Sequence, residues 1–234
     1  MKILIIGATH GNELLGIKLY QRLLRKRSPL LEHITFLIGN PKAYHAKVRY
    51  IDSDLNRSYG IDGNSYEQRR AKYIQQYIQL TQPDLVLDMH TTTCIQPNCL
   101  IINNTAGDAK RRMLAASHID TLLQVVPMND ITTLGDNIVG YEIPNQSITP
   151  QLLDDIINDL QRYVDNNAQY KAKKLYVMHD KIYKSDVTPE QAATFKNFTI
   201  HDLGCVPIMT GESSYKKQTD YLGFKASIVQ EIKV

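Results

Sequence analysis

Two histidines and a glutamate stand where apolar strand-like segments give way to loops, and their side chains suit metal chemistry. The segment "GATHGNE" (7–13) follows the apolar run "ILII" and carries His10 and Glu13 three residues apart. His90 ends a second apolar segment, "DLVLDMH" (84–90), where packing does not require an imidazole. Two imidazoles and one carboxylate form a ligand set of catalytic zinc, which leaves a position open. These three residues are therefore the candidate metal ligands.

The spacing of His10 and Glu13 has an alternative interpretation as turn and helix N-cap chemistry. His90 favours the metal interpretation, because ligands of an α/β sheet gather beyond the carboxyl ends of its strands. Asp88 lies two residues before His90 and is placed to act as a hydrogen-bond partner of a ligating imidazole.

Cationic and amide side chains are concentrated in the segment "RYIDSDLNRSY" (49–59). Arg49, Asn56 and Arg57 combine guanidinium groups with an amide, which suits recognition of a carboxylate. The alternative is a solvated loop of paired charges, since two aspartates lie between these residues.

Short apolar runs predict six buried strands that alternate with helical patterns. The runs cover residues 2–7, 34–40, 84–90, 98–104, 121–127 and 137–143. Helical periodicity covers 14–26 and 66–80, the second opened by a capping box of Ser65 and Gln68, and a third helix begins at Thr149 and Pro150. This alternation predicts an α/β fold with a largely parallel sheet flanked by helices.

The pattern changes after the polar segment 164–174. Two strand-like segments, 175–186 and 222–234, follow with only a weak helical signal between them. We therefore predict a larger domain over residues 1–166 and a small, β-rich C-terminal domain over residues 170–234.

Composition excludes several classes of protein. The chain has 234 residues, 43% of them hydrophobic, and a net charge of +3, which is too slight to favour nucleic acid as a partner. Its three cysteines are too few for a disulfide framework and suit a reducing compartment. The apolar stretch at the N-terminus is shorter than a signal peptide, and no stretch approaches the length of a membrane span. We expect a cytoplasmic protein with no membrane or nucleic-acid partner.

Five blocks of sequence carry a family pattern in the same order and approximate spacing. They are "GATHGNE" (7–13), "NPKAYHAKVRYIDSDLNR" (40–57), "DLVLDMHTTT" (84–93), "GYEIPNQ" (140–146) and "TGESSY" (210–215). Through them the chain resembles the aspartoacylase and succinylglutamate desuccinylase family, relatives of the zinc carboxypeptidases. The resemblance implies a zinc-carboxypeptidase-like fold with a mixed, largely parallel sheet. It also implies a catalytic domain over residues 1–166 and a C-terminal domain, 170–234, that caps the active site.

The resemblance assigns roles in the reaction. It implies that His10, Glu13 and His90 hold one zinc ion per chain. Glu142 of "GYEI" would be the general base and acid, and Arg49 would polarise the scissile carbonyl.

The resemblance also assigns substrate contacts. Asn56 and Arg57 would grip the substrate's carboxylate, and Tyr215 would close over the substrate from the C-terminal domain. Ordinary surface packing is the alternative for Tyr215, because tyrosine is abundant in this chain.

One departure from the family bears on the substrate. In aspartoacylases an arginine shortly before the catalytic glutamate reads the side-chain carboxylate of aspartate, but "MNDITTLGDNIVG" (128–140) holds no arginine or lysine. Either a cation from "AKRR" (109–112) reaches the pocket, or the substrate is not an N-acyl-aspartate.

The resemblance therefore implies a zinc-dependent amidohydrolase that cleaves the acyl amide of a small N-acyl amino acid, such as N-acetyl-aspartate or a related compound, to a carboxylate and a free amino acid. The alternatives are a metallocarboxypeptidase acting on peptides and a non-catalytic carboxylate-binding module on the same fold. The acyl group, the amino acid, the physiological metal and the oligomeric state, with a homo-oligomer among the options, stay open.

Overall fold

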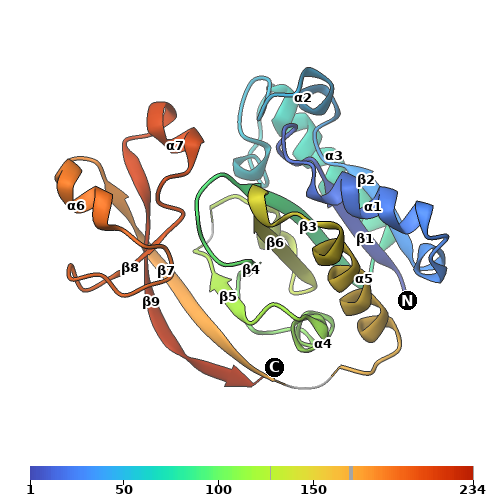
Figure 1. Ribbon diagram of the computed structural model, residues 1–234. Helices are drawn as coiled ribbons and strands as arrows, with labels where there is room; N and C mark the ends of the chain where they lie inside the picture. The colour runs from blue at the N-terminus through green and yellow to red at the C-terminus, as the bar shows by residue number, and fades with distance from the viewer. Residues whose placement is uncertain (127, 169–170, 234) are drawn as a thin grey trace.

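A computed structural model describes residues 1–126, 128–168 and 171–233. Its strands form one nine-stranded sheet, which runs across the whole molecule (Figure 1). Pro127, which ends the expected strand 121–127, lies outside the described residues. So do Tyr170 and Val234, the bounds of the predicted C-terminal domain.

The elements alternate along the first two thirds of the chain. The strands are β1 (Ile3–Gly7), β2 (Ile34–Ile38), β3 (Leu85–Thr92), β4 (Cys99–Ile102), β5 (Thr121–Gln124), β6 (Ile138–Pro144), β7 (Ala172–Tyr183), β8 (Val206–Ile208) and β9 (Tyr221–Lys233). The α-helices are α1 (Leu15–Arg25), α2 (Pro41–Ala46), α3 (Tyr66–Thr81), α4 (Asp108–Ala116), α5 (Pro150–Val164), α6 (Pro189–Thr194) and α7 (Ser213–Gln218). Short 3-10 turns are η1 (Pro29–Glu32), η2 (Leu55–Arg57), η3 (Ile131–Leu134) and η4 (Asn145–Ser147).

The sheet is mixed and mostly parallel, in the order β2-β1-β3-β6-β4-β5-β7-β9-β8. Parallel pairs join β1 to β2 and β3, β3 to β6, and β5 to β4 and β7. Antiparallel pairs join β4 to β6, and β9 to β7 and β8. The predicted α/β fold with a largely parallel sheet flanked by helices is confirmed.

Helices cover both faces of the parallel part of the sheet. Ile3 and Ile5 of β1 belong to a core cluster shared with α1, α4 and α5, whereas Leu4 and Ile6 belong to a cluster shared with α3. Successive strand residues point to opposite faces, so a strand buried on both sides is apolar at every position. This explains why the run "ILII" reads as continuous rather than alternating.

The predicted helix starts are present. The side chain of Ser65 accepts from the N–H of Gln68, whose own side chain accepts from Ser65, and together they complete a capping box at α3. Thr149 caps α5 by accepting from the N–H of Leu152, and Pro150 occupies the first turn. These caps satisfy backbone groups that a helix leaves without partners at its N-terminus.

The C-terminal strands extend the sheet of the first part of the chain. Strand β7 pairs in parallel with β5 and antiparallel with β9. Met178, Phe198, Val206 and Phe224 belong to a third apolar cluster, which also includes Leu123 of β5. The expected strands near 175–186 and 222–234 are therefore confirmed as β7 and β9. The division into two domains stays a prediction.

Within the described residues, every helix is too short or too polar to cross a lipid bilayer.

Candidate metal centre and active site

The candidate site lies at the carboxyl ends of three adjacent parallel strands, with His90 in β3, Glu142 in β6, and His10 in the loop after β1. Gly7 of β1 is in register with Met89 of β3, and His90 of β3 is in register with Glu142 of β6. The loop after β1 and the ends of β3 and β6 therefore meet at one edge of the sheet. This is the place where α/β folds bind their ligands.

The three candidate ligands converge on one another. Glu13 lies between the imidazoles: its Oε1 is 2.6 Å from Nδ1 of His10, and its Oε2 is 3.0 Å from Nδ1 of His90. One ligand atom from each of the three residues lies within 4.8 Å of the others, and all three side chains are buried. The structure thus brings the predicted ligands together.

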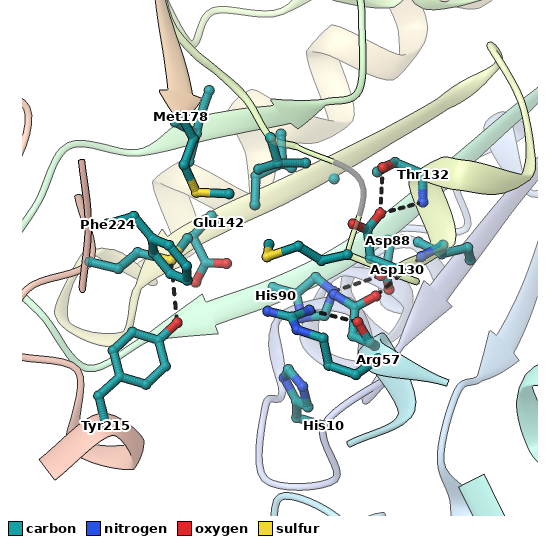
Figure 2. Close-up of a pocket in the computed structure, with 18 of the residues that line it drawn as sticks. His10, Arg57, Asp88, His90, Asp130, Thr132, Glu142, Met178, Tyr215 and Phe224 are labelled. Carbon is teal, nitrogen blue, oxygen red and sulfur yellow. Dashed lines mark hydrogen bonds and ion pairs between the residues drawn. The ribbon is translucent and has the colours of Figure 1, made fainter. Parts of the chain in front are cut away.

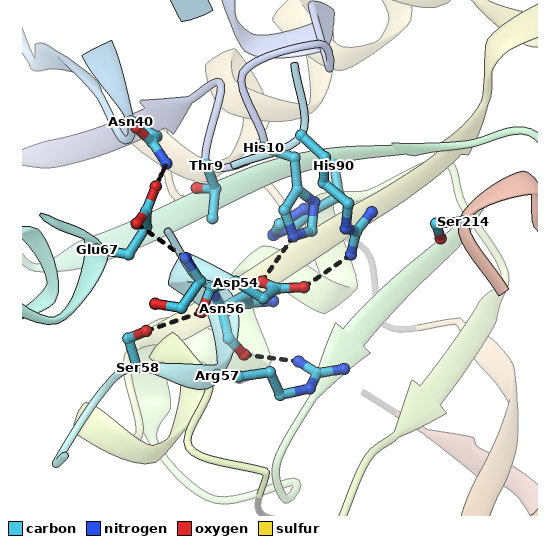
Figure 3. A network of polar contacts seen from close by, with 12 residues as sticks. Thr9, His10, Asn40, Asp54, Asn56, Arg57, Ser58, Glu67, His90 and Ser214 are labelled. Atoms are coloured by element: carbon cyan, nitrogen blue, oxygen red, sulfur yellow. Dashed lines mark hydrogen bonds and ion pairs between the residues drawn. The ribbon is translucent and has the colours of Figure 1, made fainter. Parts of the chain in front are cut away.

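A carboxylate holds the remaining nitrogen of each imidazole. Nε2 of His10 is 3.0 Å from Asp54 Oδ1, and Nε2 of His90 is 2.6 Å from Asp88 Oδ2 (Figure 3 shows the pair of His10 and Asp54). Histidines that bind metal usually donate their other ring nitrogen to such a partner, which fixes the tautomer and the ring orientation. Both rings are therefore set to present Nδ1 to a shared cation, and the donor set fits zinc.

The electrostatics of the cluster favour positive charge. Burial lowers the pKa of His90, but Asp88 and Glu13 outweigh burial and hold that pKa well above its ordinary value. For His10, the carboxylates of Glu13 and Asp54 likewise raise the pKa against the effect of burial. A divalent cation supplies the charge that these carboxylates attract.

Gly11 allows the loop between β1 and α1 to pack closely against the backbone of α2. A Cβ at this residue would lie 2.0 Å from the carbonyl carbon of Ala43 in α2. The N–H of Gly11 also donates to the carbonyl of Arg49. Glycine is required here by contact with backbone, and this contact fixes His10 beside the loop that carries Arg49.

A buried carboxylate holds that second loop in place. Glu67 is 0% exposed and accepts from the N–H groups of Ile51, Asp52 and Ser53, and from the amide of Asn40 (Figure 3). It lies in the first turn of α3, where the helix dipole favours negative charge. Sequence reasoning missed this role, because it considered residues 65–68 only as a helix cap.

Arg49 contacts the cluster of candidate ligands and lines the cavity on which this cluster opens. Its Nη2 donates to Asp54 Oδ2 at 3.0 Å, and its Nη1 is 3.5 Å from Glu13 Oε1. Burial lowers the pKa of Arg49, but the carboxylates of Asp54 and Glu13 outweigh it and raise that pKa. Asp54 therefore contacts both His10 and Arg49, a role that the sequence did not reveal.

Asn56 and Arg57 are held by local contacts. The side-chain carbonyl of Asn56 accepts from the N–H of Ile131 at 3.3 Å, which leaves its NH2 group as a donor for a ligand. Nη1 of Arg57 donates to the carbonyl of Asn56 at 2.6 Å. Both residues line the same cavity as His10 and His90.

Glu142 lines this cavity as a buried carboxyl group. Burial and the neighbouring carboxylates of Glu13 and Glu212 raise its pKa to about 8, although His90 acts in the opposite direction. A carboxyl group whose pKa lies near neutrality can both take up and release a proton.

Tyr215 of α7 closes the cavity from the C-terminal part of the chain (Figure 2). Its hydroxyl is 3.8 Å from the Met209 sulfur, and its ring packs against Tyr221 and Phe224.

Glu212 attaches α7 to the end of β3, the strand that carries His90. Its Oε2 accepts from the hydroxyl of Thr92 at 2.6 Å and from the N–H of Thr93 at 2.7 Å. The N–H of Ser213 donates back to the hydroxyl of Thr93 at 2.8 Å. Tyr215 is therefore tied to β3 through this contact, which no local sequence pattern indicates.

The remaining wall of the cavity is apolar. It is formed by Ile101, Leu123, Val125, Met128, Ile131, Met178, Met209 and Phe224 (Figure 2). Among the described residues that line it, the only cationic side chains besides the histidines are Arg49 and Arg57.

The expectation that "AKRR" (109–112) supplies a cation to the pocket is wrong. Nζ of Lys110 donates to Asn103 and Asn104, and Arg112 lies over the ring of Tyr163. Helix α4 packs beside α5 and against β6, and none of residues 109–112 lines the cavity.

Comparison with known proteins decides the family. The model of the succinylglutamate desuccinylase/aspartoacylase catalytic domain matches residues 1–142, more than half of the chain. The chain belongs to this family. A probable aspartoacylase of Nostoc sp. is 34% identical over 137 residues, 53% of this chain and 46% of the relative. An N-acyl-aromatic-L-amino acid amidohydrolase (carboxylate-forming) of Xenopus tropicalis is 38% identical over 105 residues, 39% of this chain and 34% of the relative. The aligned part thus spans less than half of either relative.

Solved structures share the fold of this family member over nearly the whole chain. The succinylglutamate desuccinylase of Chromobacterium violaceum superposes with a TM-score of 0.74 at 17% identity, covering 98% of this chain and 85% of that one. Murine aminoacylase 3 superposes with a TM-score of 0.71 at 20% identity, covering 100% and 96%. These likenesses establish the architecture.

Proposed function

We propose that this chain is a zinc-dependent amidohydrolase that cleaves the acyl amide of small N-acyl amino acids. The observation that carries the proposal is the buried cluster of His10, Glu13 and His90, which opens on a cavity that also contains Glu142. Membership of the family supports the same reaction. The products are a carboxylate and a free amino acid.

His10, Glu13 and His90 would hold the zinc ion through two Nδ1 atoms and a carboxylate. When bound, zinc acts as a Lewis acid that lowers the pKa of water and stabilises negative charge on a carbonyl oxygen. Asp54 and Asp88 keep the two imidazoles oriented for this purpose.

Two residues would act on the scissile amide. Glu142 takes a proton from the attacking water and delivers it to the amide nitrogen, a contribution of about 10²–10⁴-fold. Arg49 donates N–H groups to the oxyanion as negative charge develops, and loss of one such donor costs about 10²–10³ in turnover.

Three further residues would position the substrate. Asn56 and Arg57 donate hydrogen bonds to the carboxylate of the amino acid, and Tyr215 covers the bound molecule from helix α7. Positioning of this kind lowers the entropic cost of the reaction.

The cavity favours an amino acid with a mainly apolar side chain. An aspartate side chain would need a cation, and Arg49 and Arg57 already have partners in the reaction as proposed. The apolar wall instead offers burial to a hydrocarbon stem. The relative named as acting on N-acyl-aromatic amino acids supports this choice, whereas the relatives named aspartoacylase favour N-acetyl-aspartate. Cytoplasmic location stays a prediction, and the oligomeric state stays open.

Metal analysis and a substrate panel test the proposal. Purified protein should contain about one zinc per chain, and His90→Ala should lose both zinc and hydrolysis. His118→Ala is the matched control, because Nδ1 of His118 also contacts a buried carboxylate, Asp159 at 2.7 Å, outside the cavity. Stoichiometric zinc in His90→Ala would refute the ligand assignment. Zinc-loaded protein that hydrolyses no acetyl, succinyl or aromatic acyl amino acid would refute the reaction.

A further inference from the structure

A buried carboxylate in the wall of the cavity has no role in the reaction described above. Asp130 is 4% exposed and lies between β5 and β6, in the segment that lacks the aspartate-reading arginine. It lines the same cavity as Glu142 and Arg57 (Figure 2).

The two oxygens of Asp130 differ. Oδ1 accepts from the N–H of Thr132 at 2.8 Å and from the hydroxyl of the same residue, and so caps the turn η3. Oδ2 is shielded from solvent and has no hydrogen-bond partner within the described part of the chain. No cationic side chain of the described residues forms an ion pair with it. A buried carboxylate oxygen without a donor is costly, so a ligand that supplies one gains affinity.

The surroundings define what kind of ligand reaches this oxygen. Leu123, Val125 and Met128 line the same cavity as Asp130, and they suit a hydrocarbon stem. A carboxylate in a cavity with apolar lining residues accepts hydrogen bonds and repels groups of its own charge. Since Oδ2 is shielded from solvent, water weakens its electrostatic interaction with a ligand only slightly.

We propose that Asp130 is a specificity-determining residue that selects N-acyl amino acids whose apolar side chain ends in a hydrogen-bond donor, an ammonium or a hydroxyl group. This inference rests on the proposed hydrolase function and adds the substrate class. Asp130 would place a negative charge in the segment where aspartoacylases carry a positively charged arginine. A side chain that ends in a carboxylate is rejected.

Matched substrate pairs test the wild-type protein. Nα-acetyl-lysine should exceed Nα-acetyl-norleucine in kcat/KM, or N-acetyl-tyrosine should exceed N-acetyl-phenylalanine, by about 10–100-fold, as one charge-assisted hydrogen bond allows. The two pairs distinguish the ammonium from the hydroxyl. N-acetyl-aspartate should be the poorest substrate. Equal rates within both pairs would overturn the inference while leaving the hydrolase function intact, and no hydrolysis at all would overturn both.

Asp130→Asn tests the residue directly. The variant keeps an oxygen for the cap on Thr132 and places an NH2 donor where Oδ2 was. The preference for donor-tipped substrates should vanish, N-acetyl-glutamine should become a better substrate, and the purely apolar substrates should be unaffected. Asp136→Asn, at an exposed aspartate of the same segment, is the control and should preserve the wild-type ranking. A purely structural role for Asp130 predicts the same loss for every substrate.

Binding of products provides a second measurement. Calorimetry should show that lysine or tyrosine binds wild-type protein more tightly than norleucine or phenylalanine, and this result does not require Asp130→Asn to fold. The Tyr59→Phe variant tests whether the hydroxyl of Tyr59, rather than a ligand, donates to Oδ2 of Asp130. This hydroxyl is buried and also lacks a partner among the described residues. Burial and the carboxylates of Asp88 and Asp130 raise the pKa of Tyr59. If donor selection is absent in the wild type and emerges only in Tyr59→Phe, Oδ2 serves Tyr59 and the inference is wrong.

Discussion

Replacement of Glu142 by glutamine should abolish catalysis and at the same time stabilise the metal-free protein. Glutamine has the shape of the protonated acid but cannot take a proton from water. Turnover should fall by about 10²–10⁴-fold, while zinc content stays unchanged, because Glu142 is not among the three ligands.

The gain in stability follows from the pKa of Glu142. Burial and the nearby carboxylates raise that pKa from 4.5 to about 8. Between these two values the folded state keeps a proton that the unfolded state loses, so the free energy of unfolding falls as pH rises. At about 1.4 kcal/mol per pH unit, the wild-type protein loses about 3 kcal/mol by pH 7, and the variant does not.

Urea denaturation of zinc-free wild type and Glu142→Gln, followed from pH 4.5 to pH 8, measures this difference. The two proteins should be equally stable at the acidic end, and the gap should widen with pH and level off near pH 8. Glu32→Gln, at an exposed position, controls for removal of a carboxyl group. A gap that does not change with pH would refute the electrostatic reasoning, and an active Glu142→Gln would refute its role as base.

Three further predictions concern the supports of the site. Asp88→Asn should weaken zinc binding by about 10–100-fold in a chelator competition, because His90 loses the carboxylate that orients it. Gly11→Ala should lower both Tm and zinc content, because its Cβ would lie 2.0 Å from the Ala43 carbonyl carbon; an unchanged Tm would contradict this. Lys173→Met should cost about 1–3 kcal/mol in urea denaturation, because two buried carbonyls lose their donor; full stability would show that they are satisfied otherwise.

The sequence was sufficient to predict the features of the site that depend on neighbouring residues in the chain. Strands β1 and β3 are buried on both faces, and polar side chains follow their apolar runs. These polar side chains located His10 and His90, and the convergence of the two histidines follows from parallel pairing of the two strands.

Contacts between distant segments could not be obtained in the same way. Glu67 and Asp54 look like ordinary loop and helix-end acids, and only the folded chain turns them toward backbone N–H groups and His10. The expectation for "AKRR" failed because the sequence does not give the rotation of α4, which directs Lys110 toward Asn103. Pairing of β7 with β5 is likewise invisible, since the strands are separated by almost fifty residues.

The continuous sheet divides the site between two stretches of the chain. The candidate metal ligands and Glu142 precede residue 143, whereas Met178, Met209, Tyr215 and Phe224 come from β7, β9 and the segments that connect the C-terminal strands. In the proposed reaction, substitutions in β7–β9 would therefore alter the cavity wall without changing the candidate ligands or Glu142. Exchange of these strands between relatives would test whether they determine the substrate of the proposed reaction.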